Sequence, residues 1–313
     1  MAGDPAERPE IAVVGSANLD LVVEVDTIPV PGETVLGGDL RRIPGGKGAN
    51  QAVAAARLGR RVAMIGRLGD DDAGTTLRSA MAAAGVDTTW LLNTYATPSG
   101  TALIAVGADG DNAIVVSPGA NGRLSSADVE GAAGVLAAAD VVLLQLEVPL
   151  EAVSAAVRCA GGTVVLNPAP APASMLSLDL LDGVDVIVPN QTELATMAGH
   201  AGLSPIGDVD PETAVALARG LPIASVVVTL GAAGAMVVTP TDATHVPAPA
   251  VTPVDTTAAG DAFCGALADA LVEGADLLRA TEWAVRVGAA ATLRQGAQPS
   301  LPTRSEVGHL LGA

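Results

Sequence analysis

Aromatic residues are almost absent from this chain of 313 residues, which has two Trp, one Tyr and one Phe. Half of the residues are nevertheless apolar, so Ala, Val and Leu must fill a core that a chain of this length can make large. Small side chains of this kind suit helices packed closely on a parallel sheet. An aromatic wall for a nucleobase is hard to build, because Trp90, Tyr95 and Trp283 are the few candidates.

Cysteine and histidine are scarce as well. Cys159 and Cys264 have no metal-binding spacing, and we expect two buried, reduced thiols in a cytoplasmic protein. The histidines, His200, His245 and His309, lie far apart and form no metal-ligand pattern. The sequence therefore shows no zinc-site spacing and no Cys–His or Ser–His–Asp arrangement.

Basic residues are outnumbered. Lys and Arg total 16 against 34 Asp and Glu, a formal net charge of −18. Such a surface repels phosphate backbones and anionic lipids, so we expect no nucleic-acid and no membrane partner. No uninterrupted apolar run is long enough to span a bilayer. Residues 1–10 are polar, without the apolar segment of a signal peptide, and are expected to form a flexible N-terminus.

Short apolar runs alternate with alanine-rich segments along most of the chain. Strands are expected at 11–15, 62–66, 140–147, 162–168, 185–190 and 224–231. Helices are expected at 48–58, 73–85, 126–139 and 150–160. This alternation predicts βαβ units, and hence an α/β fold with a mostly parallel central sheet covered on both faces. No long linker is present, so we expect a single domain over residues 11–313.

Two segments interrupt the alternation. Residues 18–43 contain short alternating pieces separated by Pro and Gly, and residues 99–117 are typical of a hairpin with the turn GADGDN. About four antiparallel strands added to a parallel α/β body would form a small separate sheet. Such a sheet beside a ligand site is expected to act as a lid.

The loop RRIPGGKGAN, residues 41–50, has the glycines and lysine of a phosphate-binding loop. The G-x-x-x-x-G-K-[ST] pattern fails, because it needs Gly where Arg41 stands and Ser or Thr where Gly48 stands. A dinucleotide-binding pattern fails too, because a turn-rich segment precedes the loop. Two interpretations stay open: a plain helix-entry turn, or a turn that presents Lys47, Asn50 and exposed backbone N–H groups to a polar ligand.

Asn18 and Asp20, in the segment GSANLD after the first expected strand, project the same way if the segment is extended. An amide beside a carboxylate can form paired hydrogen bonds with a diol, which suits the recognition of sugar hydroxyls. An Asx turn explains the two residues equally well.

The segment VDTTAAGDAFCGAL places small residues where a helix is expected to begin. The backbone N–H groups of Ala258, Ala259 and Gly260 are unobstructed there and can form an anion site. Asp261 either favours the helix dipole or takes a proton from a hydroxyl that attacks phosphorus. Upstream oxygen atoms for a cation come from Asp255 and Thr257.

Polar residues end several other expected strands. Asn190 and Glu193, in PNQTE, face one side if a helix starts there and can order a hydrated Mg²⁺ near phosphates. The glycine turn TLGAAG, residues 229–234, can approach a phosphate closely, and Glu147 ends a further strand. Because ligands bind at the carboxyl ends of parallel strands, we expect these residues to share one site.

Together these segments resemble the ribokinase-like carbohydrate kinase family. PGGKGANQAVAAARLG is similar to the family's N-terminal signature, and DTTAAGDAFCGAL is similar to its C-terminal one. GSANLD, QLEVPLE, LNPAPA, PNQTE, TLGAAG and GAQPSLP occur in the family's order and spacing, from about residue 11 to residue 303. The resemblance implies a three-layer α/β sandwich with a small β-sheet lid that also forms the contact of a homodimer.

The activity that the resemblance implies is ATP-dependent phosphorylation of D-ribose at its 5-hydroxyl. Asp261 would be the catalytic base, with an anion hole at Ala258, Ala259 and Gly260. The sugar would be bound by Asn18, Asp20, Gly46, Lys47, Gly48, Ala49, Asn50, Glu147 and Asp261. The nucleotide site would contain Asn190, Thr229, Leu230, Gly231, Ala232, Ala233, Gly234, Gly260 and Asp261. Mg²⁺ would be associated with Asn190 and Glu193, and a monovalent cation, K⁺, with Asp255, Thr257, Ala291, Arg294, Gly296 and Ser300.

Val285 departs from the family pattern, because some members have a histidine there near the adenine; the base contact would then be apolar packing. A sibling kinase for another small sugar or a nucleoside is the nearest alternative, although the Asn18–Asp20 pair favours a small polyol. A non-catalytic sensor on the same fold would be expected to lose Asp261 or the anion hole, and both are present. The failed dinucleotide pattern disfavours an oxidoreductase.

Overall fold

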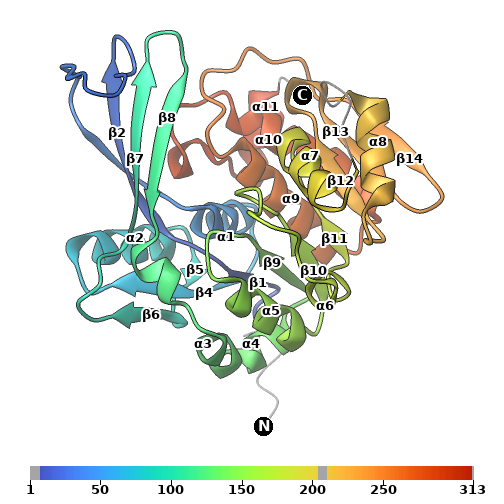
Figure 1. Cartoon of the computed structure of the whole chain (residues 1–313). Coiled ribbons are helices and arrows are strands. Elements are labelled where there is room, and N and C mark those ends of the chain that lie inside the picture. The colour runs from blue at the N-terminus through green and yellow to red at the C-terminus, as the bar shows by residue number, and fades with distance from the viewer. Residues whose placement is uncertain (1–7, 204–209, 312–313) are drawn as a thin grey trace.

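The computed structural model of the chain describes residues 8–203 and 210–311 (Figure 1). Residues 1–7 of the expected N-terminal segment lie outside the described residues. Arg8, near the end of that segment, is bound to the body, because its Nη1 donates to the Ala138 carbonyl (2.7 Å).

Ten strands form one large sheet in the described part of the chain, in the order β14-β13-β12-β11-β10-β9-β1-β4-β5, with β6 also paired to β4. Their bounds are β1 Ile11–Val14, β4 Val62–Gly69, β5 Val86–Asp87, β6 Leu91–Thr94, β9 Val141–Leu144, β10 Thr163–Leu166, β11 Val186–Ile187, β12 Val226–Thr229, β13 Ala235–Val238 and β14 Ala243–Val246. All pairings are parallel except those of β13 with β12 and β14. The predicted mostly parallel sheet is therefore confirmed.

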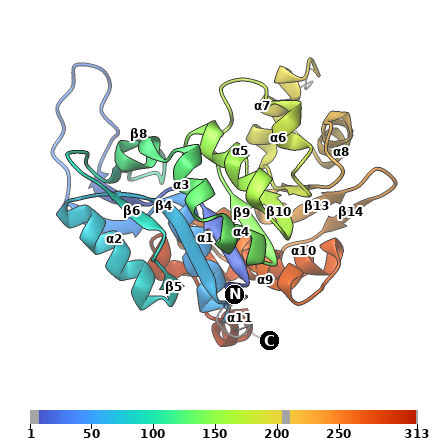
Figure 2. The ribbon, with the colours of Figure 1, turned by 90° about the horizontal axis from the view of Figure 1, so that it is seen from below.

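Helices cover both faces of this sheet, which gives the three predicted layers (Figure 2). Side chains alternate along each strand, so Val13 packs with the layer of α1, α2, α9, α10 and α11, and Val14 with that of α3 to α8. The bounds are α1 Lys47–Arg57, α2 Asp72–Ala83, α3 Ser126–Gly131, α4 Ala133–Ala138, α5 Leu150–Cys159, α6 Leu178–Leu181, α7 Gln191–His200, α8 Pro211–Gly220, α9 Ala259–Val272, α10 Leu277–Ala291 and α11 Arg304–Leu310. Short 3₁₀ turns lie at η1 Gly119–Arg123, η2 Gly231–Ala233 and η3 Gln298–Ser300. Among the described helices, none is long and apolar enough to cross a membrane.

The helix expected over 126–139 is wrong as one element, because the chain breaks it into α3 and α4 at Ala132. Gly131 and Gly134 flank the break, and glycine weakens a helix interior. The N–H of Ala132 donates to the Val129 carbonyl three residues back (3.0 Å), which tightens the last turn of α3.

The small sheet has the order β3-β2-β7-β8, with β2 Asn18–Val25, β3 Arg41–Gly45, β7 Gly100–Gly107 and β8 Asn112–Ser117. It rises from the body at one end of the molecule (Figure 1). The predicted hairpin is β7–β8, but the prediction that all its strands are antiparallel is wrong: β2 and β7 are parallel. Both strands leave the body at the same place, where Asn18 pairs with Gly100, and therefore run in the same direction.

Candidate active site

The carboxyl ends of the parallel strands meet at one edge of the large sheet, and a polar residue follows each of them. Ser16 follows β1, Gln145 and Glu147 follow β9, Asn167 follows β10, Asn190 follows β11, and Thr229 ends β12. These five strands are neighbours in the sheet. The expected gathering of polar residues at one edge is therefore present, and this is where ligands bind in open α/β sheets.

Asp261 lies in the first turn of α9 and is only 7% exposed. Asn50 Nδ2 donates to its Oδ2 (2.9 Å), and Gln51 Nε2 donates to its Oδ1 (3.1 Å). Burial raises the pKa of Asp261 above its ordinary value, although the charge of Lys47 and the two N–H donors act in the opposite direction. Such a carboxylate can take a proton from a hydroxyl placed against it.

The N-terminus of α9 offers free backbone donors. Ala258 caps it with a φ of 59°, which is unusual for a residue with a side chain. Within the described chain the N–H groups of Ala258, Gly260 and Asp261 donate to no acceptor, whereas that of Ala259 donates to the Thr256 carbonyl (3.2 Å). The free donors expected at Ala258 and Gly260 are present, and Asp261 supplies the third in place of Ala259.

Two glycines, at the end of β3 and just before α1, allow close contacts with the residues of β2. An added Cβ at Gly46, where φ is 89°, would lie 2.6 Å from the Asn18 nitrogen. One at Gly45 would lie 2.2 Å from Asp20 Oδ2. The backbone contacts exclude a side chain at Gly46, whose conformation also favours glycine, and a side chain at Gly45 would require the Asp20 carboxylate to move.

The first turn of α1 does not present exposed N–H groups, so that part of our expectation is wrong. The N–H of Lys47 donates to Glu147 Oε2 (3.1 Å). The N–H groups of Gly48 and Ala49 donate to the Ser16 hydroxyl (3.4 Å) and carbonyl (2.8 Å). The half-buried carboxylate of Glu147 and the loop after β1 thus satisfy these donors, which have no acceptor within the helix.

Asn18 and Asp20 project from the same face of β2, as predicted, and their place in a strand rules out the Asx turn. Asn18 Oδ1 accepts from Asn121 Nδ2 (2.7 Å), which leaves the Asn18 amide nitrogen for a ligand. Burial, together with the charges of Glu147 and Asp261, raises the pKa of Asp20 to about 7.

Lys47 and Asn50 complete the polar cluster. Burial lowers the pKa of Lys47, but the charges of Asp261, Glu147 and Glu193 outweigh it, so the pKa lies above its ordinary value. The ammonium group makes no direct ion pair with any described residue. Asn50 Oδ1 is buried and has no partner in the described chain, so it can accept from a ligand hydroxyl.

Asn190 and Glu193 cap α7 reciprocally. Asn190 Oδ1 accepts from the Glu193 N–H (2.8 Å), and Glu193 Oε2 accepts from the Asn190 N–H (2.8 Å). The N-x-x-E spacing is thus explained by a capping box, which leaves one carboxylate oxygen of Glu193 for another role. The described residues contain no group of three or more His, Cys, Asp or Glu that could hold a metal. A Mg²⁺ ion here would need most of its ligands from phosphates and water.

The expected nucleotide turn follows β12. Thr229 ends the strand, Leu230 is buried, and residues 231–233 are exposed. The Leu230 N–H donates to the Gly234 carbonyl (2.8 Å) and closes the turn. Gly234 has a φ of 97°, and an added Cβ would lie 2.0 Å from the Val246 carbonyl oxygen, so only glycine fits.

Val285 lies on α10 in the core between the sheet and the α9 layer, with 5% of its surface exposed. Phe263 belongs to the same core cluster. An apolar contact is what Val285 can offer a base, and most of its surface already packs within the protein.

The segments expected to hold a monovalent cation come together around Asp255. Its oxygens accept from the N–H groups of Thr257 (2.9 Å) and Gly296 (2.8 Å). Burial raises its pKa, but these donors lower it to a net value below the ordinary one, so the carboxylate stays ionised and suits a cation. Of the other residues, Ala291 ends α10, Arg294 pairs with Glu306 (2.7 Å), and the Ser300 hydroxyl donates to the Ala297 carbonyl (2.8 Å).

Sequence reasoning missed five side chains that hold the site together: Ser16, Gln51, Asn121, Gln145 and Asn167. All of them except Asn121 stand beside a residue or strand end that the sequence did single out. Their partners are distant in sequence, as in the bond from the Ser16 hydroxyl to Glu147, so no spacing pattern indicates them.

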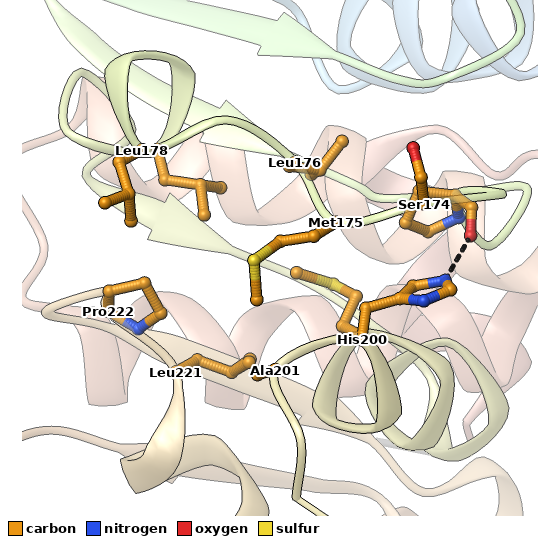
Figure 3. Close-up of a pocket in the computed structure, with 11 residues that line it drawn as sticks. Ser174, Met175, Leu176, Leu178, His200, Ala201, Leu221 and Pro222 are labelled. Atoms are coloured by element: carbon orange, nitrogen blue, oxygen red, sulfur yellow. Dashed lines mark hydrogen bonds between the residues drawn. The ribbon is translucent and has the colours of Figure 1, made fainter.

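A pocket lies elsewhere, between α6, α7 and the segment after α8 (Figure 3). Its walls are mainly apolar, with Met175 and Met197 among the lining residues, and His200 Nε2 is bonded to the Pro172 carbonyl (3.1 Å). It contains none of the residues expected at the site.

Comparisons with known proteins give one consistent result. The sequence matches the pfkB family carbohydrate kinases over residues 8–304. It is 39% identical to the ribokinase of Bacillus subtilis, over 96% of this chain and 99% of that protein. It is 38% identical to the deoxyribokinase of Salmonella typhi, over 94% of this chain and 96% of that protein. The structure of Arabidopsis thaliana ribokinase with ribose and ATP superposes with a TM-score of 0.83 and 32% identity, covering 98% and 99% of the two chains.

Proposed function

The chain belongs to the pfkB family of carbohydrate kinases, and from that premise we propose that it transfers the γ-phosphate of ATP to the 5-hydroxyl of D-ribose. The product is D-ribose 5-phosphate. One observation carries the proposal: the buried carboxylate of Asp261 stands beside free N–H groups at the start of α9. This pairing of a base with an anion site is what transfer to a hydroxyl requires.

The sugar lies between the small sheet and α1. Asn18 and Asp20 bind its hydroxyls from the side of the small sheet, and the unpartnered Asn50 Oδ1 accepts a further hydrogen bond. Glu147 holds the start of α1 in place through the Lys47 N–H (3.1 Å). Lys47, with no direct ion pair of its own in the described chain, supplies positive charge to the sugar or the incoming phosphate.

Asp261 receives the proton of the 5-hydroxyl as the hydroxyl oxygen bonds to the γ-phosphorus. The bond from that phosphorus to the bridging oxygen breaks, and ADP leaves. The N–H groups of Ala258, Gly260 and Asp261 face the charge that the transferred group carries. The nucleotide is held along Asn190 and the turn from Thr229 to Gly234.

Two ions complete the proposal. Mg²⁺ would neutralise phosphate charge and would take most of its ligands from ATP and water, and the remaining Glu193 oxygen would be the nearby protein group. Asp255, Thr257 and the segment 291–300 would hold K⁺, which would supply positive charge beside the loop that leads into α9. The Gly296 N–H donates to Asp255 (2.8 Å) and already joins that segment to this loop.

The small sheet closes over the sugar and excludes water, so that ribose and not water accepts the phosphate. Its opposite face pairs with the same face of a second copy, which makes the protein a homodimer. Because its phosphate donor is ATP, we also propose that the protein works in the cytoplasm.

A second candidate substrate has specific support, because one relative of 38% identity is a deoxyribokinase. Removal of the sugar 2-hydroxyl would leave one polar partner in the Asn18–Asp20 pair unused. A nucleoside is disfavoured by the shortage of aromatic residues.

The test is ADP production by the purified protein over D-ribose, 2-deoxy-D-ribose, other pentoses, D-fructose and nucleosides, with Mg²⁺ and with or without K⁺. We expect the highest kcat/KM with D-ribose and stimulation by K⁺ over Na⁺. Turnover with 2-deoxy-D-ribose alone would reassign the sugar. Turnover with nucleosides alone, or none with any acceptor, would overturn the proposal.

A further inference from the structure

Gln51 follows Asn50 on α1, is completely buried, and has no place in the roles described above. Its Nε2 donates to Asp261 Oδ1 (3.1 Å) and to Asn167 Oδ1 (3.2 Å). Its Oε1 accepts from Gln145 Nε2 (2.6 Å). All hydrogen-bonding groups of this amide therefore have partners: the Asp261 carboxylate, and Gln145 and Asn167, which follow β9 and β10.

The orientation of this amide is set from outside the site. Asn167 Nδ2 donates to the Val188 carbonyl (2.8 Å), which can only accept, so the Asn167 oxygen must face Gln51. Gln51 must then present its nitrogen to Asn167 and to Asp261, and its oxygen to Gln145. A flip would bring oxygens together at both Asn167 and Asp261, so one orientation is enforced.

We propose that Gln51 is a positioning residue, whose amide, locked by Asn167 and Gln145, fixes the rotamer of the Asp261 carboxylate. Asn50 holds Oδ2 and Gln51 holds Oδ1, so rotation of the carboxylate would break both hydrogen bonds. The lone pairs that remain face the acceptor hydroxyl. This inference rests on the proposed kinase activity.

The composition of the surroundings argues against a purely structural role. The layer in which Gln51 lies is built of Ala, Val and Leu, and a buried amide there costs free energy unless every atom is bonded. Gln145 is packed so tightly that an added Cβ at Gly15 would lie 2.0 Å from its Oε1, an oxygen without a partner in the described chain. The unpartnered Gln145 oxygen is a cost that a purely structural arrangement would avoid, so we infer that the amides serve Asp261.

The first test is Gln51→Met, which keeps the length of the side chain and removes its hydrogen bonds. We expect kcat to fall roughly 10- to 100-fold, because a misplaced base loses near-attack geometry. KM for the sugar should stay within about threefold, because Asn18 and Asp20 are untouched. The acid limb of the kcat–pH profile should move to higher pH, because loss of an N–H donor raises the pKa of Asp261.

A double-mutant cycle separates positioning from general stability. If Asn167 acts through Gln51, then the double variant Gln51→Met/Asn167→Leu should have the same kcat as the single variant Gln51→Met. The control is Thr281→Val, which removes the hydrogen bond from a fully buried hydroxyl of α10 to the Leu277 carbonyl (2.7 Å) and should leave kcat unchanged. Additive losses, an unmoved pH profile or an effect on KM alone would overturn the proposal.

The carboxyl carbon of Asp261 gives a readout independent of turnover. Its ¹³C resonance, assigned with Asp261→Asn, is titrated in the unmodified protein and in Gln51→Met. We expect a higher pKa of Asp261 in the variant, and equal values would overturn the positioning role. Failure of the unmodified protein to phosphorylate any sugar would overturn the proposed function, while the titration would still decide the role of Gln51.

Discussion

Three acidic side chains, Glu147, Glu193 and Asp261, act on the single ammonium group of Lys47 at the site, and a fourth, Asp20, lies near Glu147 and Asp261. Burial and mutual repulsion disfavour the ionised form of Asp20 and Asp261, whose pKa values are raised. Sugar hydroxyls that donate to these carboxylates would offset part of that cost. These carboxylates therefore lower the folding stability of the protein without bound sugar, and in return they can bind sugar hydroxyls and accept a proton.

Asp261→Asn should separate binding from chemistry. The variant keeps the shape of the side chain but cannot accept the hydroxyl proton, so we expect kcat to fall by about 10²- to 10⁴-fold. Sugar affinity should change little, because Asn18, Asp20 and Asn50 remain. Steady-state kinetics and calorimetric sugar binding check this. Asp72→Asn, in the first turn of α2, is the matched control and should be fully active; near-normal turnover of Asp261→Asn would remove its role as base.

The raised pKa of Asp20, about 7, makes stability depend on pH in a definite direction. Between its ordinary value of 3.8 and about 7, the unfolded chain has lost this proton while the folded chain keeps it. Stability therefore falls as pH rises through this window. Asp20→Asn should raise the free energy of unfolding by roughly 2 kcal/mol at pH 8, and by less at pH 5.

Thermal and urea unfolding of the unmodified protein and of Asp20→Asn at the two pH values measure this effect. The neighbours Glu147 and Asp261 are the same residues in both proteins. Sugar binding should depend on pH in the opposite direction to stability. The ionised carboxylate is the better acceptor for hydroxyls, so KM of the unmodified protein should rise as pH falls below 7. A pH-independent KM, or equal stabilisation at both pH values, would contradict the shifted pKa.

Helix α9 links the site to the rest of its layer. Its N-terminus carries Asp261, and two turns later the fully buried Asp269 accepts from Arg60 Nε (2.6 Å), Trp283 Nε1 (2.8 Å) and Arg304 Nη2 (2.6 Å). These partners bring α10 and α11 against α9. Asp269→Ala would leave two arginines without their buried partner, so we expect a loss of about 3 kcal/mol in the free energy of unfolding.

Urea denaturation checks this prediction, and kcat of the folded variant should stay close to that of the unmodified protein. Glu282→Ala is the control, because its ion pair with Arg279 (3.1 Å) is exposed. Its loss should cost less than about 0.5 kcal/mol. Equal effects of the two variants would show that Asp269 does not hold the helices together.

The elements differ in how far the sequence could predict them. Apolar runs such as residues 11–14 and 62–66 lie in the large sheet as expected, because a buried parallel strand leaves a strong pattern. The parallel pairing of β2 and β7 depends on where the chain re-enters the small sheet, which no local pattern contains. Gln51 likewise contacts Asp261, and Asn167 contacts Gln51, only because folding brings together segments that are distant in sequence. Motif residues were therefore predictable, and the residues that hold them were not.

At the scale of the whole molecule, the small sheet has two different faces. The pairing of Asp20 with Ala102, and of Ala102 with Val116, puts these three on the face toward the site. Leu103 and its partner Val115 lie on the opposite face, where they are 52% and 65% exposed. Exposed apolar side chains on one sheet face, beside the free edge at β8, are the features on which the proposed homodimer contact rests.

The homodimer proposed through this face gives the last prediction. Val115→Asp places a charge on the face proposed for the contact. Burial of an unpaired charge disfavours association, so we expect monomers at concentrations where the unmodified protein is dimeric. Light scattering after size-exclusion chromatography measures the mass. Val30→Asp is the matched control, because Val30 is equally exposed (65%) and lies outside the sheet.

A monomeric Val115→Asp should also bind sugar less tightly. In the proposed dimer the contact would support the sheet that carries Asn18 and Asp20, so a monomer would need to order that sheet when the sugar binds. We expect KM for the sugar to rise while kcat at saturation changes less. A dimeric Val115→Asp would exclude this face as the contact, and a monomer with unchanged KM would show that the lid closes without help from the second copy.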